Sequence, residues 1–177
     1  LVDDHTLLRE GVAGLLDSNP DMTVVGSFGG GRAVIEFVAT HEADVAVVDI
    51  AMPDMNGIEV VRQLQDASPQ TQVLMLSAYV DAEYVFLALR AGAQGYVAKE
   101  SAGRVLAEAV RTVHAGKRYM CEQADTEALR HVLAMRRAET PLGRMSTRER
   151  EVLQLTVEGH SIAETADRLG ISPKSVE

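Results

Sequence analysis

The sequence has little cysteine and few aromatic residues. Cys121 is the one cysteine among 177 residues, tryptophan is absent, and aromatic residues make up only 4% of the chain. A single cysteine excludes an internal disulfide and is typical of a reducing compartment, so we expect a cytoplasmic protein. Because hydrophobic residues still account for 46% of the chain, we expect a mainly aliphatic core.

Long apolar runs are also absent. No run approaches the ~20 residues that span a bilayer, so we expect no membrane partner. The chain begins Leu1-Val2-Asp3-Asp4, without the basic segment that opens a signal peptide. Since only two apolar residues precede these acids, we expect a few further residues before Leu1 in the natural protein.

The chain has no excess of basic residues and carries a net charge of −9. Residues 1–117 contain 16 acidic and 8 basic side chains, whereas residues 118–177 contain 10 and 9. The strongly acidic first part argues against a nucleic-acid surface there. The nearly neutral second part indicates nothing by itself.

Short apolar runs alternate with helical patterns over residues 1–117. Such alternation predicts an α/β domain with a five-stranded, doubly wound parallel sheet. Its expected strands are Leu1–Val2, Met22–Gly26, Asp44–Asp49, Val73–Leu76 and Tyr96–Ala98.

The pattern changes after residue 117. Residues 118–143 are predicted to be a connector, partly helical, and residues 144–177 a small all-α domain. Ser146 to Glu149 and Ser161 to Glu164 match the capping box that starts a helix. Ser172-Pro173 predicts the start of a third helix after Gly170, which makes the segment a helix-turn-helix.

Polar side chains follow several of the predicted strands, at the point where each strand ends. In an open parallel sheet, ligands bind in the crevice beyond these ends. Clustered carboxylates repel one another unless a cation lies among them, and Mg²⁺ prefers oxygen ligands. These side chains therefore predict Mg²⁺-dependent phosphoryl transfer to Asp49. They are Asp3, Asp4, Asp49, Ser77 and Lys99.

A purely structural reading treats Asp3-Asp4 as a turn and Asp49 as a helix cap. It suits any one of these acids alone, but their shared position at strand ends favours a site. Two further features are weaker. Gly29-Gly30-Gly31 lacks the spacing of a phosphate-binding loop and is interpreted as a plain loop, and His5 is expected to face solvent or to start a helix.

Four segments resemble the receiver domain of bacterial two-component response regulators: Leu1–His5, Val47–Gly57, Leu76–Ala78 and Ala91–Lys99. The segments Met145–Leu153, Ile162–Ala163 and Leu169–Glu177 resemble a LuxR-type DNA-binding domain. This combination is similar to the NarL/FixJ family. The resemblance implies a phosphorylation-dependent transcriptional regulator with a flavodoxin-like receiver fold, and it covers most of the chain except the connector.

The resemblance also implies residue roles. Asp49 would be the phosphoacceptor, and Mg²⁺ would be bound by Asp4, by Asp3 through water, by Asp49 and by the Ala51 carbonyl. Lys99 would pair with the phosphoryl group.

Ser77 and Tyr96 would rearrange on phosphorylation. The implied partners are a sensor histidine kinase, promoter DNA and, on activation, a second copy of the chain. No outside substrate is implied, only phosphotransfer to the protein itself and loss of its own phosphoryl group.

The third helix would supply the DNA contacts. Its candidates are Ser172, Lys174, Ser175 and Glu177. Because a recognition helix reads bases from its first turns and the sequence stops after barely one turn, we expect this chain to bind DNA weakly or not at all.

The alternative function is enzymatic. Phosphatases of the haloacid-dehalogenase type also combine an aspartate nucleophile, Mg²⁺, a hydroxyl and a lysine. They place a second aspartate two residues after the nucleophile as the general acid, and this sequence has Ala51 there. The helix-turn-helix has no role in that alternative.

Overall fold

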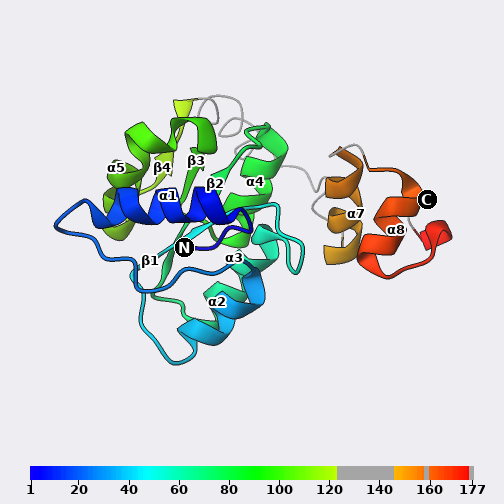
Figure 1. Cartoon of the computed structure of the whole chain (residues 1–177), viewed down its shortest axis with the longest axis horizontal. Helices are drawn as coiled ribbons and strands as arrows, with labels where there is room; N and C mark the ends of the chain where they lie inside the picture. The colour runs from blue at the N-terminus through cyan, green and yellow to red at the C-terminus, as the bar shows by residue number, and fades with distance from the viewer. Residues whose placement is uncertain (123–145, 158–159, 176–177) are drawn as a thin grey trace. The chain divides into compact units, whose positions relative to one another are not determined.

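The computed structural model describes residues 1–122, 146–157 and 160–175. The chain forms two compact units, Leu1–Ala134 and Met135–Glu177 (Figure 1). The first unit is an α/β domain and the second is helical over its described residues.

A parallel sheet forms the centre of the first unit. Its strands are β1 (Val45–Val48), β2 (Gln72–Ser77), β3 (Gly95–Ala98) and β4 (Tyr119–Met120), in the order β1-β2-β3-β4. Successive strands are joined by helical crossovers, as parallel pairing requires. All four strands therefore end at the same edge of the sheet.

Helices cover both faces of the sheet (Figure 1). Helices α1 (Thr6–Asp17) and α5 (Ala102–His114) pack on one face. Helices α2 (Gly31–Val38), α3 (Gly57–Ala67) and α4 (Ala82–Ala91) pack on the other.

Strand side chains alternate between these two layers, because successive residues of a strand point to opposite faces of the sheet. In β2, Val73 and Met75 join the core under α2, α3 and α4, whereas Leu74 and Leu76 join the core under α1 and α5. Since both faces are buried, the strands are nearly continuous apolar runs, which is why the sequence predicts them.

The predicted fold class is confirmed, but the predicted number of strands is wrong. The described residues form four strands, and neither Leu1–Val2 nor Met22–Gly26 is one of them. Val2 makes single parallel bridges to Val48 and to Phe28. The Leu1 carbonyl also accepts the Phe28 N–H at 2.9 Å, but the chain turns at Asp3 toward α1, and residues 22–26 form no ladder within the described residues.

Strand β4 was not predicted. Tyr119–Met120 falls within residues 118–143, which the sequence pattern indicated to be a connector. It pairs with β3, and Cys121 beyond it is buried, so the sheet continues past residue 117. A two-residue strand has no periodicity from which to recognise it. The rest of the predicted connector, residues 123–143, lies outside the described residues.

The second unit contains the two predicted helices, α7 (Thr147–Val157) and α8 (Ile162–Leu169), which pack on each other. Both capping boxes are present: Ser146 with Glu149, and Ser161 with Glu164. Gly170 ends α8 in the left-handed region at φ 62°, where glycine is favoured. These caps satisfy backbone groups that short helices leave exposed.

Over the described residues, the predicted third helix is a 3₁₀ turn, η3 (Pro173–Ser175). It follows α8 after the Gly170 turn and packs on that helix. None of the helices in the described ranges combines the length and apolar composition that a membrane span requires.

We predict that Gly57→Ala destabilises the first unit. Gly57 donates its N–H to the Ile50 carbonyl at 2.8 Å, and an added Cβ would lie 1.9 Å from the Asp49 carbonyl oxygen. Because the obstacle is backbone, the β1–α3 loop must shift. Urea denaturation should show a loss of roughly 1–3 kcal/mol or more.

The matched control is Gly103→Ala. Gly103 lies in α5, and a Cβ added there would meet no atom within 4 Å. Its free energy of unfolding should therefore stay unchanged or rise by up to ~1 kcal/mol, because alanine favours the helix more than glycine does. Equal stability of the two variants would contradict the close approach at Gly57.

Candidate functional site

Three segments bring charged side chains to the carboxyl edge of the sheet: residues 3–5, Asp49 and Lys99. The Val2–Val48 bridge, with the Asp49 N–H donating to the Val2 carbonyl at 2.9 Å, places Asp3 beside Asp49. Lys99 follows β3 directly and opens the 3₁₀ turn η1 (Lys99–Ser101). The strand register therefore decides which side chains meet.

Lys99 is shared by two buried carboxylates. Its Nζ lies 2.7 Å from Asp49 Oδ2 and 2.8 Å from Asp3 Oδ2. Asp3 is 1% exposed and Asp49 2% exposed. The Ile50 N–H donates to Asp49 Oδ1 at 2.7 Å, which leaves Asp49 held on both oxygens.

Burial and charge oppose each other at this pair. Burial raises the pKa of Asp49, and the hydrogen bond and charge of Lys99 offset that rise only in part. Burial by itself would lower the pKa of Lys99, but its close contacts with the charged Asp3 and Asp49 outweigh burial, and the pKa of Lys99 is raised. The single Lys99 ammonium thus interacts with two carboxylates, those of Asp3 and Asp49.

A second group of polar side chains lies at the ends of β2 and β3. Ser77, the last residue of β2, is fully buried, and its Oγ accepts the Tyr79 N–H at 3.1 Å. Tyr96 in β3 is fully buried too, and its hydroxyl donates to the Tyr79 carbonyl. Burial raises the pKa of Tyr96, which keeps its hydroxyl a donor.

The acid cluster offers ligands for a cation. One ligand atom each from Asp3, Asp4, His5 and Asp49 lies within 4.8 Å of the others. Asp3 Oδ2 and Asp4 Oδ1 are buried, and they lie 2.8 Å from the Lys99 ammonium and 2.9 Å from His5 Nδ1. Clustered carboxylates that outnumber the one ammonium beside them fit a hard cation such as Mg²⁺.

The structure brings together most of the residues singled out in the sequence. Asp3, Asp4, Asp49 and Lys99 form the charged cluster. Ala51 lies in the β1–α3 loop, two residues after Asp49, and no described contact joins it to the cluster.

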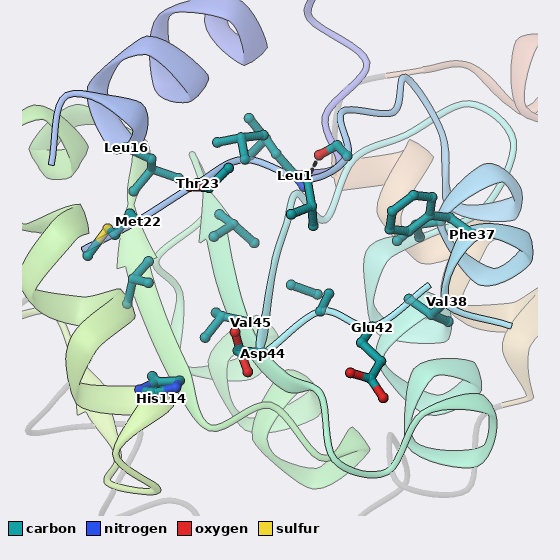
Figure 2. Close-up of a pocket in the computed structure, with 18 of the residues that line it drawn as sticks. Leu1, Leu16, Met22, Thr23, Phe37, Val38, Glu42, Asp44, Val45 and His114 are labelled. Carbon is teal, nitrogen blue, oxygen red and sulfur yellow. Dashed lines mark hydrogen bonds between the residues drawn. The ribbon is translucent and has the colours of Figure 1, made fainter. Parts of the chain in front are cut away.

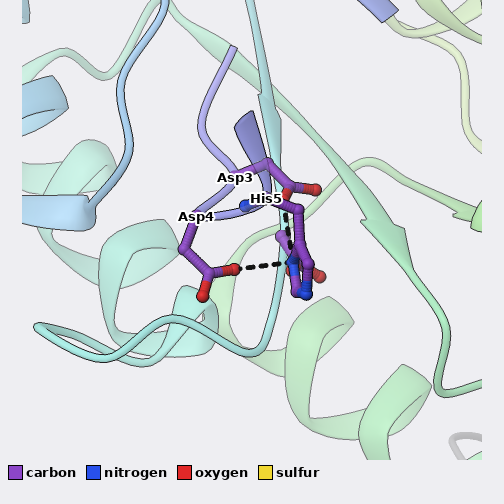
Figure 3. A group of neighbouring side chains, drawn as sticks. Asp3, Asp4 and His5 are labelled. Carbon is purple, nitrogen blue, oxygen red and sulfur yellow. Dashed lines mark hydrogen bonds and ion pairs between the residues drawn. The ribbon is translucent and has the colours of Figure 1, made fainter. Parts of the chain in front are cut away.

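Two contributions to the site were not predicted from the sequence. The His5 ring contacts the acids (Figure 3), although the side chain is exposed at the start of α1 as expected. Its place directly after two acids was the available signal. The second is the Tyr79 carbonyl, and a backbone acceptor has no sequence signal.

The candidate DNA-contacting residues lie in the second unit. Ser172, Lys174 and Ser175 are exposed on and before η3, and the hydroxyls of Ser172 and Ser175 lie 2.8 Å apart. Glu177 lies outside the described residues.

A cavity of about 230 Å³ opens at the other end of the strands, near the start of β1 (Figure 2). Its walls are mainly aliphatic, with Leu1, Phe37 and Val45 among them. The Leu1 backbone nitrogen donates to the Gly26 carbonyl at 2.9 Å. The candidate functional site is the acid cluster and not this aliphatic cavity, because the charged side chains converge at the cluster.

Family models match both parts of the chain. The response regulator receiver domain matches residues 1–111, and sigma-70 region 4, a helix-turn-helix, matches residues 135–177.

Similar proteins match along most of the chain. The DNA-binding transcriptional activator DevR/DosR of Mycobacterium tuberculosis is 36% identical over 177 residues, which cover 100% of this chain and 82% of the relative. A LuxR-family two-component response regulator from Aurantimonas is 27% identical, with a TM-score of 0.70 over 75% of this chain and 94% of that one. The response regulator RcsB in complex with DNA is 25% identical, with a TM-score of 0.67 over 99% and 83%.

We predict that Asp49→Asn stabilises the protein at neutral pH, on the order of 1 kcal/mol. The folded state holds the Asp49 proton more tightly than the unfolded state, because its pKa is raised. Wild-type stability therefore falls as pH rises from about 4 through that raised pKa, and the asparagine variant escapes the loss. Lys99 keeps Asp3 as its partner.

Urea denaturation of both proteins from acid to neutral pH measures the difference, which should shrink toward acid pH. Asp66→Asn, at an exposed position of α3, is the control and should show no such trend. A difference that grows toward acid pH would contradict the raised pKa of Asp49.

Proposed function

This chain is a two-component response regulator of the NarL/FixJ family, and we propose that it accepts a phosphoryl group on Asp49 from a sensor histidine kinase. Its function is that of a DNA-binding transcriptional regulator that depends on phosphorylation. The phosphatase alternative has no support among these similarities, and Ala51 lacks the carboxyl group that it requires.

The shared ammonium is the observation that carries the proposal. Lys99 Nζ contacts Asp3 and Asp49 from one position at 2.8 and 2.7 Å. A phosphoryl group on Asp49 would bring new anionic oxygens to this ammonium, which already points at the acceptor carboxylate. Such preorganised charge stabilises phosphoryl transfer without a large rearrangement.

The acid cluster fits Mg²⁺. Asp3, Asp4 and Asp49 would hold the ion, with the Ala51 carbonyl as a further oxygen ligand. The excess of clustered carboxylates over the single Lys99 ammonium supports this assignment. When bound, Mg²⁺ supplies positive charge that offsets the charge of the phosphoryl group.

The transfer step makes one bond and breaks one. An Asp49 carboxylate oxygen attacks phosphorus while the P–N bond of a phosphohistidine breaks, and the departing imidazole keeps the electron pair and takes a proton. Water later attacks the phosphoryl group, which leaves inorganic phosphate and the free Asp49 carboxylate. The protein thus acts on its own phosphoryl group and is not a conventional enzyme.

Ser77 and Tyr96 would couple phosphorylation of Asp49 to a change in side-chain packing. In the structure, the Ser77 hydroxyl accepts the Tyr79 N–H at 3.1 Å. A Ser77 hydroxyl drawn to the phosphoryl group releases this N–H. The Tyr79 carbonyl also holds the Tyr96 hydroxyl, so the two hydrogen bonds meet at one residue. Loss of the hydrogen bond between the Tyr79 N–H and Ser77 frees the segment around Tyr79 and allows Tyr96 to change its packing.

The second unit would contact promoter DNA. Ser172, Lys174 and Ser175 lie exposed on one turn, where a lysine and two hydroxyls can contact phosphates. DevR/DosR is named a DNA-binding transcriptional activator, and one RcsB structure is of its complex with DNA. We propose that activation pairs two copies of this chain, because dimers match the half-sites of a symmetric operator.

We predict that acetyl phosphate with Mg²⁺ adds one phosphoryl group to the protein. Intact mass spectrometry should detect it in the wild type and in Asp66→Asn, but not in Asp49→Asn. Asp66→Asn is the matched control because it removes an exposed carboxylate of α3. Continued phosphorylation of Asp49→Asn would refute Asp49 as the acceptor.

We predict that Ser77→Ala accepts phosphate but no longer moves Tyr96. Because the chain has no tryptophan, near-ultraviolet circular dichroism reports on its four tyrosines. Phosphorylation should change this spectrum in the wild type and leave it nearly unchanged in Ser77→Ala and in Tyr96→Phe. Ser77→Thr keeps the hydroxyl and should restore the change, and a wild-type response in Ser77→Ala would remove Ser77 from the switch.

A further inference from the structure

The three glycines at residues 29–31 lie between the two acid-bearing segments of the site. Their spacing indicated a plain loop, and in the structure they lead into α2. Phe28, directly before them, pairs with the start of the chain: its carbonyl accepts the Asp3 N–H at 3.0 Å, and its N–H donates to the Leu1 carbonyl at 2.9 Å. The glycine segment is therefore held to the segment that carries Asp3 and Asp4.

Asp54 holds the same segment from the other side. It lies in the loop between β1 and α3, and its Oδ1 and Oδ2 accept the N–H groups of Gly31 and Arg32, each at 3.1 Å. These are the first two residues of α2, whose N–H groups have no partner within the helix. A carboxylate also suits the positive end of the helix dipole. Asp54 thus caps α2 from a distant part of the chain.

This contact depends on the missing side chain of Gly30. A Cβ added to Gly30 would lie 2.6 Å from both carboxylate oxygens of Asp54. The backbone of Gly30 is extended, with φ of −168°, so the restriction is one of space and not of conformation. At Gly29 an added Cβ would meet the Arg9 guanidinium at 3.6 Å, an ordinary contact. A methyl group at Gly30, but not at Gly29, therefore displaces the Asp54 carboxylate.

The loop that Asp54 holds is the one that follows the proposed phosphoacceptor. Its two ends are joined by the Gly57 N–H, which donates to the Ile50 carbonyl at 2.8 Å, and Asp54 fixes its middle to α2. Ala51, whose carbonyl is the proposed Mg²⁺ ligand, lies between these fixed points. Because Mg²⁺ requires a nearly octahedral set of ligands, a small displacement of this carbonyl weakens binding.

We propose that Asp54 is a positioning residue for phosphoryl acceptance. Its contact with the start of α2 holds the Ala51 carbonyl at the spacing from Asp3 and Asp4 that Mg²⁺ requires. Asp54 itself is exposed, and no described contact joins it to the acid cluster, so it acts through the loop backbone. The inference rests on the proposed function because it concerns the same site.

Calorimetric titration with Mg²⁺, together with amide hydrogen exchange of the metal-free protein, tests this assignment. Asp54→Ala should speed exchange at Gly31 and Arg32, because both N–H groups lose their acceptor. It should weaken Mg²⁺ binding at least about threefold, less than the tenfold or more for a partner that touches the ligand directly. Phosphorylation by acetyl phosphate should be slower at low Mg²⁺ and return to the wild-type rate at saturating Mg²⁺.

Three further variants separate position from charge. Gly30→Ala keeps the net charge and should reproduce the weaker Mg²⁺ binding, and combining it with Asp54→Ala should weaken binding no further, since both break one contact. Gly29→Ala is the matched control for the added methyl group. Asp66→Ala removes the same charge from an exposed position of α3. Both controls should bind Mg²⁺ like the wild type.

The outcomes distinguish this inference from the proposed function. If Asp54→Ala speeds exchange at Gly31 and Arg32 but leaves Mg²⁺ binding unchanged, Asp54 only caps α2 and the inference is wrong. It is also wrong if Asp66→Ala weakens Mg²⁺ binding as much as Asp54→Ala does, because the effect is then one of net charge. If the wild type itself binds no Mg²⁺, the metal site of the proposed function fails, and this inference fails with it.

Discussion

One ammonium group shared by two buried carboxylates is the contact on which the site depends. Burying charge costs several kcal/mol per ion unless partners compensate. Lys99 compensates Asp3 and Asp49 together, and Asp4 adds a further acid at the edge of the same pocket. The carboxylates of the pocket therefore outnumber the one ammonium that compensates them. This imbalance adds to the burial that raises the pKa of Asp49 and, in the proposed function, attracts a divalent cation.

The aliphatic sheet fixes the geometry of this pocket. Parallel strands buried on both faces pack different side chains against each helical layer, so a one-residue slip would disrupt the packing of both layers. Asp49, Ser77 and Lys99 inherit their positions from the register of the strands. Close backbone contact at Gly57 holds the loop after Asp49 against the same strand end. The chemical groups thus lie on short loops and turns carried by a rigid core.

The two units are stabilised in different ways. The first buries two apolar layers against its sheet. The described helices of the second are short, and the capping boxes at Ser146 and Ser161 with the Gly170 turn define their ends.

In the proposed switch, Tyr96 responds to the change at Ser77 through Tyr79. The Tyr79 carbonyl accepts the buried Tyr96 hydroxyl, and the Tyr79 N–H donates to Ser77. A buried ring with one acceptor has few alternative packings, which favours two discrete states.

The sequence by itself determined the fold class, the helix caps and the charged cluster of Asp3, Asp4, Asp49 and Lys99, because strand ends and capping boxes are local patterns. Only the tertiary structure decided which extended segments pair. Residues 22–26 are an apolar-rich segment typical of a strand but gain no ladder, whereas Tyr119–Met120 pairs with β3 although two residues carry no pattern. It also decided that the exposed His5 ring meets the acids and that Tyr96 meets a backbone carbonyl. Pairing and side-chain contacts join residues far apart in the chain or depend on backbone direction, so no local pattern encodes them.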